Sequence, residues 1–305
     1  MKKTNKMLAC ALTVMLLAQG SALAASAQGR DETRTYESEL YSYQEHKGLG
    51  TVKNKSIWSY TRPSVSIQGK SVSVRGLIIG DTYYIPFRAA ANALGAQYNY
   101  SSSAKTATMK LGSLTLISSD GCYTTYANDR ALFSVMPTVI MNDGRMYIPL
   151  DIFLKATGLR ATKSTSAVTV SGSFAPLAHA SSFYRSDEVL WLARIIHAEA
   201  QGEPLLGQIA VGNVVLNRVK SSAYPNTIYG VIFDRKYGVQ FSPILNGTIY
   251  NTPSYSATLA AKICLDGFDI SDGALYFLQP HLSTSSWIPK NRPYAFTIGS
   301  HDFYK

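Results

Sequence analysis

The sequence is poor in cysteine, histidine and acidic residues. Its 305 residues include 3 Cys, 5 His and 19 Asp plus Glu, against 29 Lys plus Arg. This cysteine content excludes a disulfide framework, and neither a Cys-x-x-Cys motif nor the His and Cys spacing of a zinc site is present. We expect Cys122 and Cys264 to be buried free thiols in different domains. The sequence predicts no metal site and no cofactor.

Long apolar runs are also missing after the N-terminus. Residues 1–24 have the features of a signal peptide, namely a charged start with Lys2 and Lys3, an apolar run from Met7 to Ala18 that is too short for a bilayer, and the cleavage motif Ala22-Leu23-Ala24. No later segment is long and apolar enough to span a membrane. We therefore expect an exported protein with no membrane span after removal of the signal.

The remaining chain divides into four parts. Residues 25–64 are polar, rich in tyrosine and poor in aliphatic residues, which predicts a flexible tether. Residues 65–172 contain a duplication, since Tyr84-Ile85-Pro86-Phe87 recurs as Tyr147-Ile148-Pro149-Leu150, and Gly158 follows Gly95 by the same 63 residues. Each copy predicts a strand ending in Ile-Pro, a short helix stopped by Gly, and further strands. Residues 173–186 are predicted to be a linker, and residues 187–305 the catalytic domain.

The duplicated region resembles the copper amine oxidase N-terminal-like domain of secreted proteins in Gram-positive bacteria. No histidine lies between Gly50 and Leu177, so a His-ligated copper site is excluded there. From Asp187 onward the chain has nine basic and nine acidic residues, so the basic excess lies in the N-terminal half. Such a module can adhere to anionic wall polymers, whereas nucleic acid is not expected as the partner of an exported protein. We expect a stalk or wall-docking module.

Glu199 is the candidate catalytic residue. A helix is predicted from Ser186, its candidate N-cap, with acidic residues in the first turn. One face at helical spacing contains Leu192, Ile195, Ile196 and Glu199. A carboxyl on an apolar face is desolvated, which raises its pKa towards the range of a general acid at neutral pH. The alternative is a glutamate that turns to solvent or pairs with an arginine. After Asp187, however, the only glutamates are Glu188, Glu199 and Glu203.

The C-terminal part resembles a known family in several motifs that occur in order. These motifs are HAEAQGEP, GQIAVGNVVLNRV, QFSP, GALYFLQP, SSWI and IGSHDFY, between about Glu188 and Tyr304. They resemble the cell-wall hydrolase family of spore cortex-lytic enzymes, the SleB/CwlJ type. The resemblance implies an α+β chain with a lysozyme-like, mainly helical catalytic domain. It also implies lytic transglycosylase activity, with Glu199 as the glutamate of the HAEA segment.

Four further residues are predicted to bind substrate. Tyr276 is a candidate to hydrogen-bond the Glu199 carboxyl or the sugar, and Gln240 and Trp287 are candidates to line a glycan groove. Glu203 follows Glu199 by four residues, but Gly202 and Pro204 predict a helix break between them. For each of these side chains, core packing or helix capping is the alternative interpretation.

A second catalytic carboxylate is not obvious. Glycosidases usually use two, but the aspartates of this domain lie in predicted loops or helix ends: Asp234, Asp266, Asp269 and Asp272. One acid suffices if the muramoyl 6-hydroxyl attacks its own sugar, which closes a 1,6-anhydro ring. The prediction is a secreted enzyme of the wall or spore cortex of a Gram-positive bacterium, which cleaves peptidoglycan between N-acetylmuramic acid and N-acetylglucosamine.

Two other functions remain open from the sequence. A metal-dependent peptidoglycan amidase or peptidase would need ligands, for which His197, His281 and His301 are available without recognisable ligand spacing. A non-catalytic wall-binding protein would need no reactive group. The sequence also leaves open whether an accessory protein is required.

Overall fold

The computed structural model describes residues 60–305, except residues 237 and 284–285. These residues form two compact units, the first ending at Ala180 and the second beginning at Ser181. The predicted signal peptide, residues 1–24, and most of the predicted tether, residues 25–64, lie outside the described part of the chain. Within that part, no helix has the length and apolar character needed to cross a membrane.

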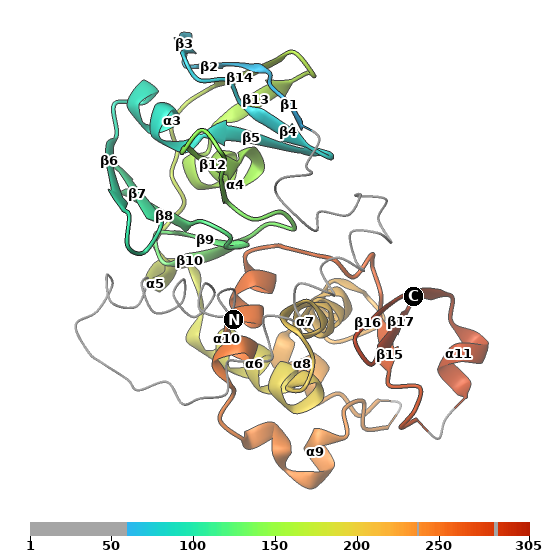
Figure 1. Cartoon of the computed structure of the whole chain (residues 1–305). Coiled ribbons are helices and arrows are strands. Elements are labelled where there is room, and N and C mark those ends of the chain that lie inside the picture. Colours follow the sequence, from blue (N-terminus) through green and yellow to red (C-terminus); the bar gives the residue numbers. More distant parts are fainter. Residues whose placement is uncertain (1–59, 237, 284–285) are drawn as a thin grey trace. The chain divides into compact units, whose positions relative to one another are not determined.

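The first unit is rich in β-structure (Figure 1). Its three sheets have the strand orders β1-β4-β5-β12-β11, β10-β9-β8-β7-β6 and β13-β14-β2-β3 among the described residues. The elements are β1 (Tyr60–Thr61), β2 (Ser64–Ile67), β3 (Lys70–Val72), β4 (Leu77–Ile79), β5 (Thr82–Pro86), α3 (Phe87–Ala93), β6 (Gln97–Ser101), β7 (Thr106–Leu111), β8 (Leu114–Ser119), β9 (Thr124–Ala127), β10 (Arg130–Phe133), β11 (Val139–Ile140), β12 (Met146–Pro149), α4 (Leu150–Thr157), β13 (Arg160–Lys163) and β14 (Ala167–Ser171). Strands β14 and β2 run parallel.

The duplication is visible as two copies of one supersecondary unit. The order β5-α3-β6-β7 recurs as β12-α4-β13-β14. The two copies meet where β5 and β12 pair antiparallel, with Ile85 opposite Ile148, its own equivalent. Pro86 and Pro149 precede the two helices, because a proline at a helix start lacks only an N–H that would be unpaired there anyway. The equivalent glycines Gly95 and Gly158 both adopt positive φ after the helices, as predicted.

Segments on both sides of residues 65–172 also pack with this unit. Strand β1, at Tyr60–Thr61, pairs with β4 and so belongs to the first sheet instead of the tether. Phe174 and Leu177, assigned to the linker, pack against the hydrophobic core. The Asn128 side-chain amide donates to the Leu177 carbonyl over 2.8 Å. Strand pairing thus holds β1 to the first sheet, and apolar contacts hold Phe174 and Leu177 to the core.

The prediction of two free thiols is half right. Cys264 is free and buried, and burial raises the pKa of its thiol well above the usual range. Cys122 is disulfide-bonded, so the prediction is wrong at this position.

The second unit is mainly helical, with one small sheet at its C-terminal end (Figure 1). The elements are α5 (Ala180–Phe183), α6 (Ser186–Ala200), α7 (Leu205–Lys220), α8 (Ile228–Ile232), α9 (Pro243–Asn246), the 3-10 helix η2 (Thr248–Tyr250), α10 (Tyr255–Leu265), β15 (Tyr276–Leu278), α11 (Trp287–Asn291), β16 (Tyr294–Ile298) and β17 (His301–Tyr304). The sheet order is β15-β17-β16, and all of its pairs are antiparallel. The predicted α+β class is confirmed.

Helix α6 packs against both α7 and α10. It begins at Ser186, and Arg185 occupies the N-cap position without a side-chain cap, so the predicted capping role of Ser186 is wrong. Asp187 and Glu188 in the first turn complement the helix dipole instead. Gly212 of α7 permits the close packing, because a Cβ there would lie 2.8 Å from both the Cys264 Sγ and the Ile196 Cδ1.

Candidate active site

Glu199 lies in the last turn of α6, at the end of a buried face. Leu192, Ile195 and Ile196 of this face are 0% exposed, and Glu199 itself is half-buried. Burial raises the pKa of Glu199 to about 7, against the positive charges of His301 and Arg218, which lower it. A carboxyl with this pKa holds a proton near neutral pH and can take it back after ionisation. These are the properties of a general acid that later acts as a base.

Arg218, near the end of α7, is the buried cation of the site. Its side chain is 5% exposed, and its Nε donates to the Leu275 carbonyl over 2.8 Å. The guanidinium carbon lies 5.1 Å from the ring centroids of both Tyr224 and Phe241. Burial lowers the pKa of Arg218, but an arginine remains charged under all ordinary conditions. A fixed positive charge therefore acts on the Glu199 carboxyl from inside the domain.

A row of alternating cations and aromatic rings leads from Arg218 to the surface. The Arg218 guanidinium lies 5.6 Å from the Tyr276 ring centroid, and the Arg292 guanidinium lies 4.7 Å from the same centroid on β15. Arg292 is also 5.2 Å from the Trp287 ring, which is 51% exposed. Tyr276 and Trp287 meet edge to face with centroids 6.4 Å apart. An exposed aromatic ring at the end of such a row is suited to contact a sugar face.

The predicted substrate-binding residues differ in their surroundings. The Tyr276 hydroxyl hydrogen-bonds with Tyr224, and the charge of Arg218 acts on both Tyr276 and Glu199. Arg292 therefore connects Tyr276 with Trp287 by contact with both rings. The charge of Arg218 connects Tyr276 with Glu199. Gln240 is half-buried, and its amide donates to the Gly238 carbonyl over 3.2 Å. Its neighbour Phe241 is the residue that contacts Arg218.

Glu203 is fixed by the turn between β16 and β17. The Ser300 backbone N–H donates to the Glu203 carboxylate over 3.0 Å, the Ser300 hydroxyl donates to its other oxygen, and the His301 Nδ1 lies 3.5 Å away. Burial alone would raise the pKa of Glu203, but the contacts from His301 and Ser300 hold it below its usual value. Glu203 is therefore a carboxylate near neutral pH. His301 links it to Glu199, since its charge acts on both.

Gly299 is required for this arrangement. It has a φ of +60°, and a Cβ at this position would overlap the Glu203 Oε2. We expect Gly299→Ala to lower the free energy of unfolding by about 2–4 kcal/mol, because left-handed backbone strain adds to the clash. Denaturant unfolding measures the change. Gly202→Ala is the matched control, since nothing lies within 4 Å of the Cβ that it adds. A loss for Gly299→Ala no larger than that of the control would contradict this role.

The loop aspartates fall into two groups. Three are engaged away from Glu199: Asp266 accepts from the Tyr184 hydroxyl, Asp269 accepts from Ser271, and Asp272 pairs with Lys305 at 3.0 Å. Asp234 is different, because its negative charge acts on Arg218, as does that of Glu199. Its Oδ1 also accepts from the Lys236 backbone N–H over 2.9 Å. Asp234 is therefore the aspartate that shares the cation of the candidate site.

The histidines considered as metal ligands lie in different surroundings. The His197 Nδ1 accepts from the Ser254 backbone N–H over 3.4 Å, His301 is buried beside Glu203, and His281 is exposed. Within residues 60–305, omitting 237 and 284–285, no group of three or more His, Cys, Asp or Glu side chains is placed to hold a metal ion.

Several residues of the site were not found from the sequence. Arg218 was missed because it lies in an apolar helix and its role depends on rings from other elements. His301 was considered only as a metal ligand, and Arg292 and Tyr224 were not considered at all. A weak signal existed for Arg218, since it is one of only nine basic residues from Asp187 onward and lies in a strongly apolar helix.

Sequence comparison matches two parts of the chain to known families. Residues 202–304 match the cell wall hydrolase family, and residues 66–171 match the copper amine oxidase N-terminal domain. The C-terminal domain belongs to the cell wall hydrolase family. The family match begins at Gly202, so that Glu199 lies three residues before it. Arg218, Tyr276, Trp287 and His301 all lie inside the cell wall hydrolase domain.

The relatives of this cell wall hydrolase domain are spore cortex-lytic enzymes. The chain is 40% identical to that of Bacillus cereus over 122 residues, which is 40% of this chain and 46% of the relative. It is 38% identical to that of Bacillus subtilis (strain 168) over 120 residues, 39% of this chain and 38% of the relative. The chain thus spans less than half the length of these curated relatives.

A solved structure is also similar in sequence. It is the catalytic domain of the germination-specific lytic transglycosylase SleB from Bacillus anthracis, with 40% identity. The match covers 40% of this chain and 97% of that domain, with a TM-score of 0.37.

Proposed function

We propose that the cell wall hydrolase domain cleaves the glycan strand of peptidoglycan between N-acetylmuramic acid and N-acetylglucosamine, as a lytic transglycosylase. The observation that carries this proposal is the half-buried Glu199 at the end of the buried face of α6, whose pKa burial raises to about 7 against the charges of His301 and Arg218. The names of the relatives support the same substrate class. Spore cortex is the proposed source of that peptidoglycan, reached by export of the protein.

The proposed reaction begins with Glu199 protonated. Glu199 donates its proton to the glycosidic oxygen, the bond from that oxygen to the muramoyl C1 breaks, and positive charge develops at C1. The carboxylate then takes the proton of the muramoyl 6-hydroxyl as that oxygen bonds to C1, which closes the 1,6-anhydro ring. Glu199 ends protonated, so one carboxyl completes the cycle. Arg218 stabilises the transient carboxylate by its charge.

The neighbouring carboxylates support a reaction with one acid. Glu203 is ionised and held by Ser300 and His301, so it serves to position His301. The charges of Asp234 and Glu199 both act on Arg218, so Asp234 is the first candidate base if the reaction were hydrolysis. The substrate's own hydroxyl makes such a base unnecessary, because an intramolecular nucleophile has a high effective molarity.

Mass spectrometry of digested sacculi tests the reaction. We expect muropeptides with 1,6-anhydro ends, which are one water, roughly 18 Da, lighter than the hydrolysed products. Only reducing muramic acid ends would contradict the mechanism and make Asp234→Asn the next variant to measure. Release of peptide amino groups would indicate an amidase or peptidase. Sacculi that lose no turbidity would indicate a non-catalytic wall-binding protein.

A further inference from the structure

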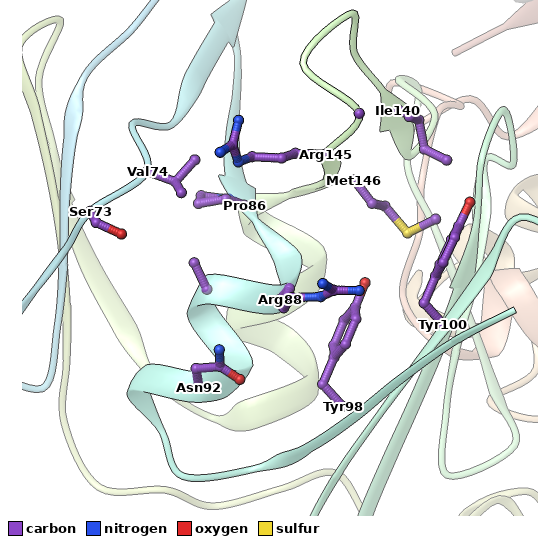
Figure 2. Close-up of a pocket in the computed structure, with 12 residues that line it drawn as sticks. Ser73, Val74, Pro86, Arg88, Asn92, Tyr98, Tyr100, Ile140, Arg145 and Met146 are labelled. Atoms are coloured by element: carbon purple, nitrogen blue, oxygen red, sulfur yellow. The ribbon is translucent and has the colours of Figure 1, made fainter. Parts of the chain in front are cut away.

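The first unit contains a pocket that the catalytic proposal does not use. It has a volume of about 290 Å³ and lies beside α3, the helix of the first repeat copy (Figure 2). Its lining comes from α3, β6, the ends of β5 and β11, the start of β12 with the turn before it, and the residues after β3: Ser73, Val74, Pro86, Arg88, Ala89, Asn92, Tyr98, Tyr100, Ile140, Gly144, Arg145 and Met146. A pocket of this size is near the lower limit for small-molecule sites.

The lining is cationic and aromatic. It includes two exposed arginines, Arg88 and Arg145, and no acidic residue. In Figure 2, Arg88 extends from α3 towards Tyr98, and its guanidinium carbon lies 5.1 Å from the Tyr98 ring centroid. Tyr98 and Tyr100 are two residues apart on β6, so their side chains project from the same face of the strand. The pocket thus offers guanidinium groups, which bind carboxylates and phosphates, and tyrosine rings, which have an apolar face and a polar edge.

Arg145 retains positive charge beside its partner. Asp143, in the turn before β12, lies 3.4 Å from the Arg145 Nη1 and 3.7 Å from the Arg62 Nη1. The carboxylate also accepts from the Tyr147 hydroxyl over 2.8 Å. One carboxylate thus faces two guanidinium groups. The cluster of Arg62, Asp143 and Arg145 therefore carries a net positive charge at the edge of the pocket.

The second repeat copy has an ion pair at the positions equivalent to Arg88 and Tyr100. With the offset of 63 residues, Asp151 occupies the position of Arg88, and Lys163 the position of Tyr100. The Lys163 Nζ lies 3.4 Å from the Asp151 carboxylate and 5.2 Å from the Tyr83 ring centroid. Lys163 of the second copy is therefore paired with an acid of the same copy. In the first copy, Tyr100 stands where the second copy has Lys163, and Arg88 lines the open pocket together with Arg145 from the turn before β12.

We propose that this pocket binds an anionic saccharide unit of a wall polymer, with Arg88 and Arg145 on its carboxylate or phosphate and with Tyr98 and Tyr100 against its ring. Guanidinium groups bind both anions through paired N–H donors, and tyrosine rings bind the apolar faces of sugars. The choice of a wall polymer rests on the proposed function of the second unit. The pocket itself belongs wholly to the first unit.

The test measures binding of the full-length protein to sacculi by sedimentation, in the cold and without measurable digestion. We expect Arg88→Ala with Arg145→Ala to weaken binding about 10- to 100-fold, since charge-assisted hydrogen bonds are lost. The matched control is Lys155→Ala with Arg160→Ala, which removes the same charge from the second copy. The control should change binding only slightly, in a manner that salt screens.

The source of the anion is decided by removing phosphate polymers from the sacculi with hydrofluoric acid. Weaker binding of the pocket variant on stripped and untreated sacculi would indicate a carboxylate of peptidoglycan. Weaker binding on untreated sacculi alone would indicate a phosphate polymer. Equal binding by the pocket and control variants on both would overturn the proposal. Cleavage of soluble glycan fragments should be unchanged in the pocket variant, so failure of this proposal is distinguishable from failure of the catalytic one.

Discussion

Glu199→Gln should abolish glycan cleavage by the full-length protein. The amide keeps the shape of the side chain, but it cannot donate a proton to the glycosidic oxygen or take one from the 6-hydroxyl. General acid-base catalysis contributes roughly 10²- to 10⁴-fold, so a loss of at least that size is expected. The release of soluble muropeptides from sacculi measures it.

A matched variant on the same helix provides the control. Glu188→Gln changes a carboxylate in the first turn of α6, away from the candidate site, and should keep wild-type activity. Glu203→Gln should be milder than Glu199→Gln, because Glu203 positions His301 and transfers no proton. Activity of Glu199→Gln within about tenfold of wild type would remove Glu199 from its proposed role.

The loss of activity should not be a loss of stability. Burial raises the pKa of Glu199 from 4.5 to about 7, so the folded protein binds this proton more tightly than the unfolded chain does. The free energy of unfolding therefore falls as the pH rises from 4.5 to 7, and this group lowers it by up to about 3 kcal/mol. Above pH 7 the group lowers it no further. Thermal unfolding should show Glu199→Gln to be at least as stable as wild type at pH 8. This advantage should disappear below pH 4.5.

Arg218→Met should reduce cleavage about 100-fold and change its pH dependence. The buried guanidinium lowers the pKa of Glu199 and stabilises the carboxylate formed on proton transfer. Without it, the pKa of Glu199 rises further, so the alkaline limb of kcat/KM should move to higher pH while the maximum falls. Wild-type activity should fall as the pH rises through about 7, because the acid must be protonated.

Arg218→Lys separates the charge from the packing. A lysine keeps a positive charge near Glu199, but it lacks the Nε that donates to the Leu275 carbonyl and the planar group that lies among Tyr224, Phe241 and Tyr276. Its pH profile should stay close to that of wild type, even where its rate is lower. An unchanged pH profile for Arg218→Met would show that the arginine serves packing alone.

The local sequence pattern was sufficient to predict helix α6, which carries Glu199, and the duplicated unit before it. Helical spacing predicted a helix from Ser186 with Glu199 in its last turn, and the structure has α6 at residues Ser186–Ala200. The constant offset of 63 residues predicted the duplicated unit, which appears as two strand-helix-strand copies paired at Ile85 and Ile148. Periodicity and repeats are properties of neighbouring or equivalent positions. They can therefore be read along the chain without knowledge of the fold.

The surroundings of Glu199 were decided by tertiary structure. Arg218 comes from the next helix and His301 from the last strand, and neither lies near Glu199 in the sequence. The composition of the chain determined that cations, aromatics and only three glutamates were available after Asp187. Contacts between distant segments decided that Glu203 binds the Ser300 turn. They also decided that Arg88 lines an open pocket, whereas its equivalent Asp151 pairs with Lys163. Burial and charge pairing set the pKa and the role of each side chain, and both exist only once those segments have packed together.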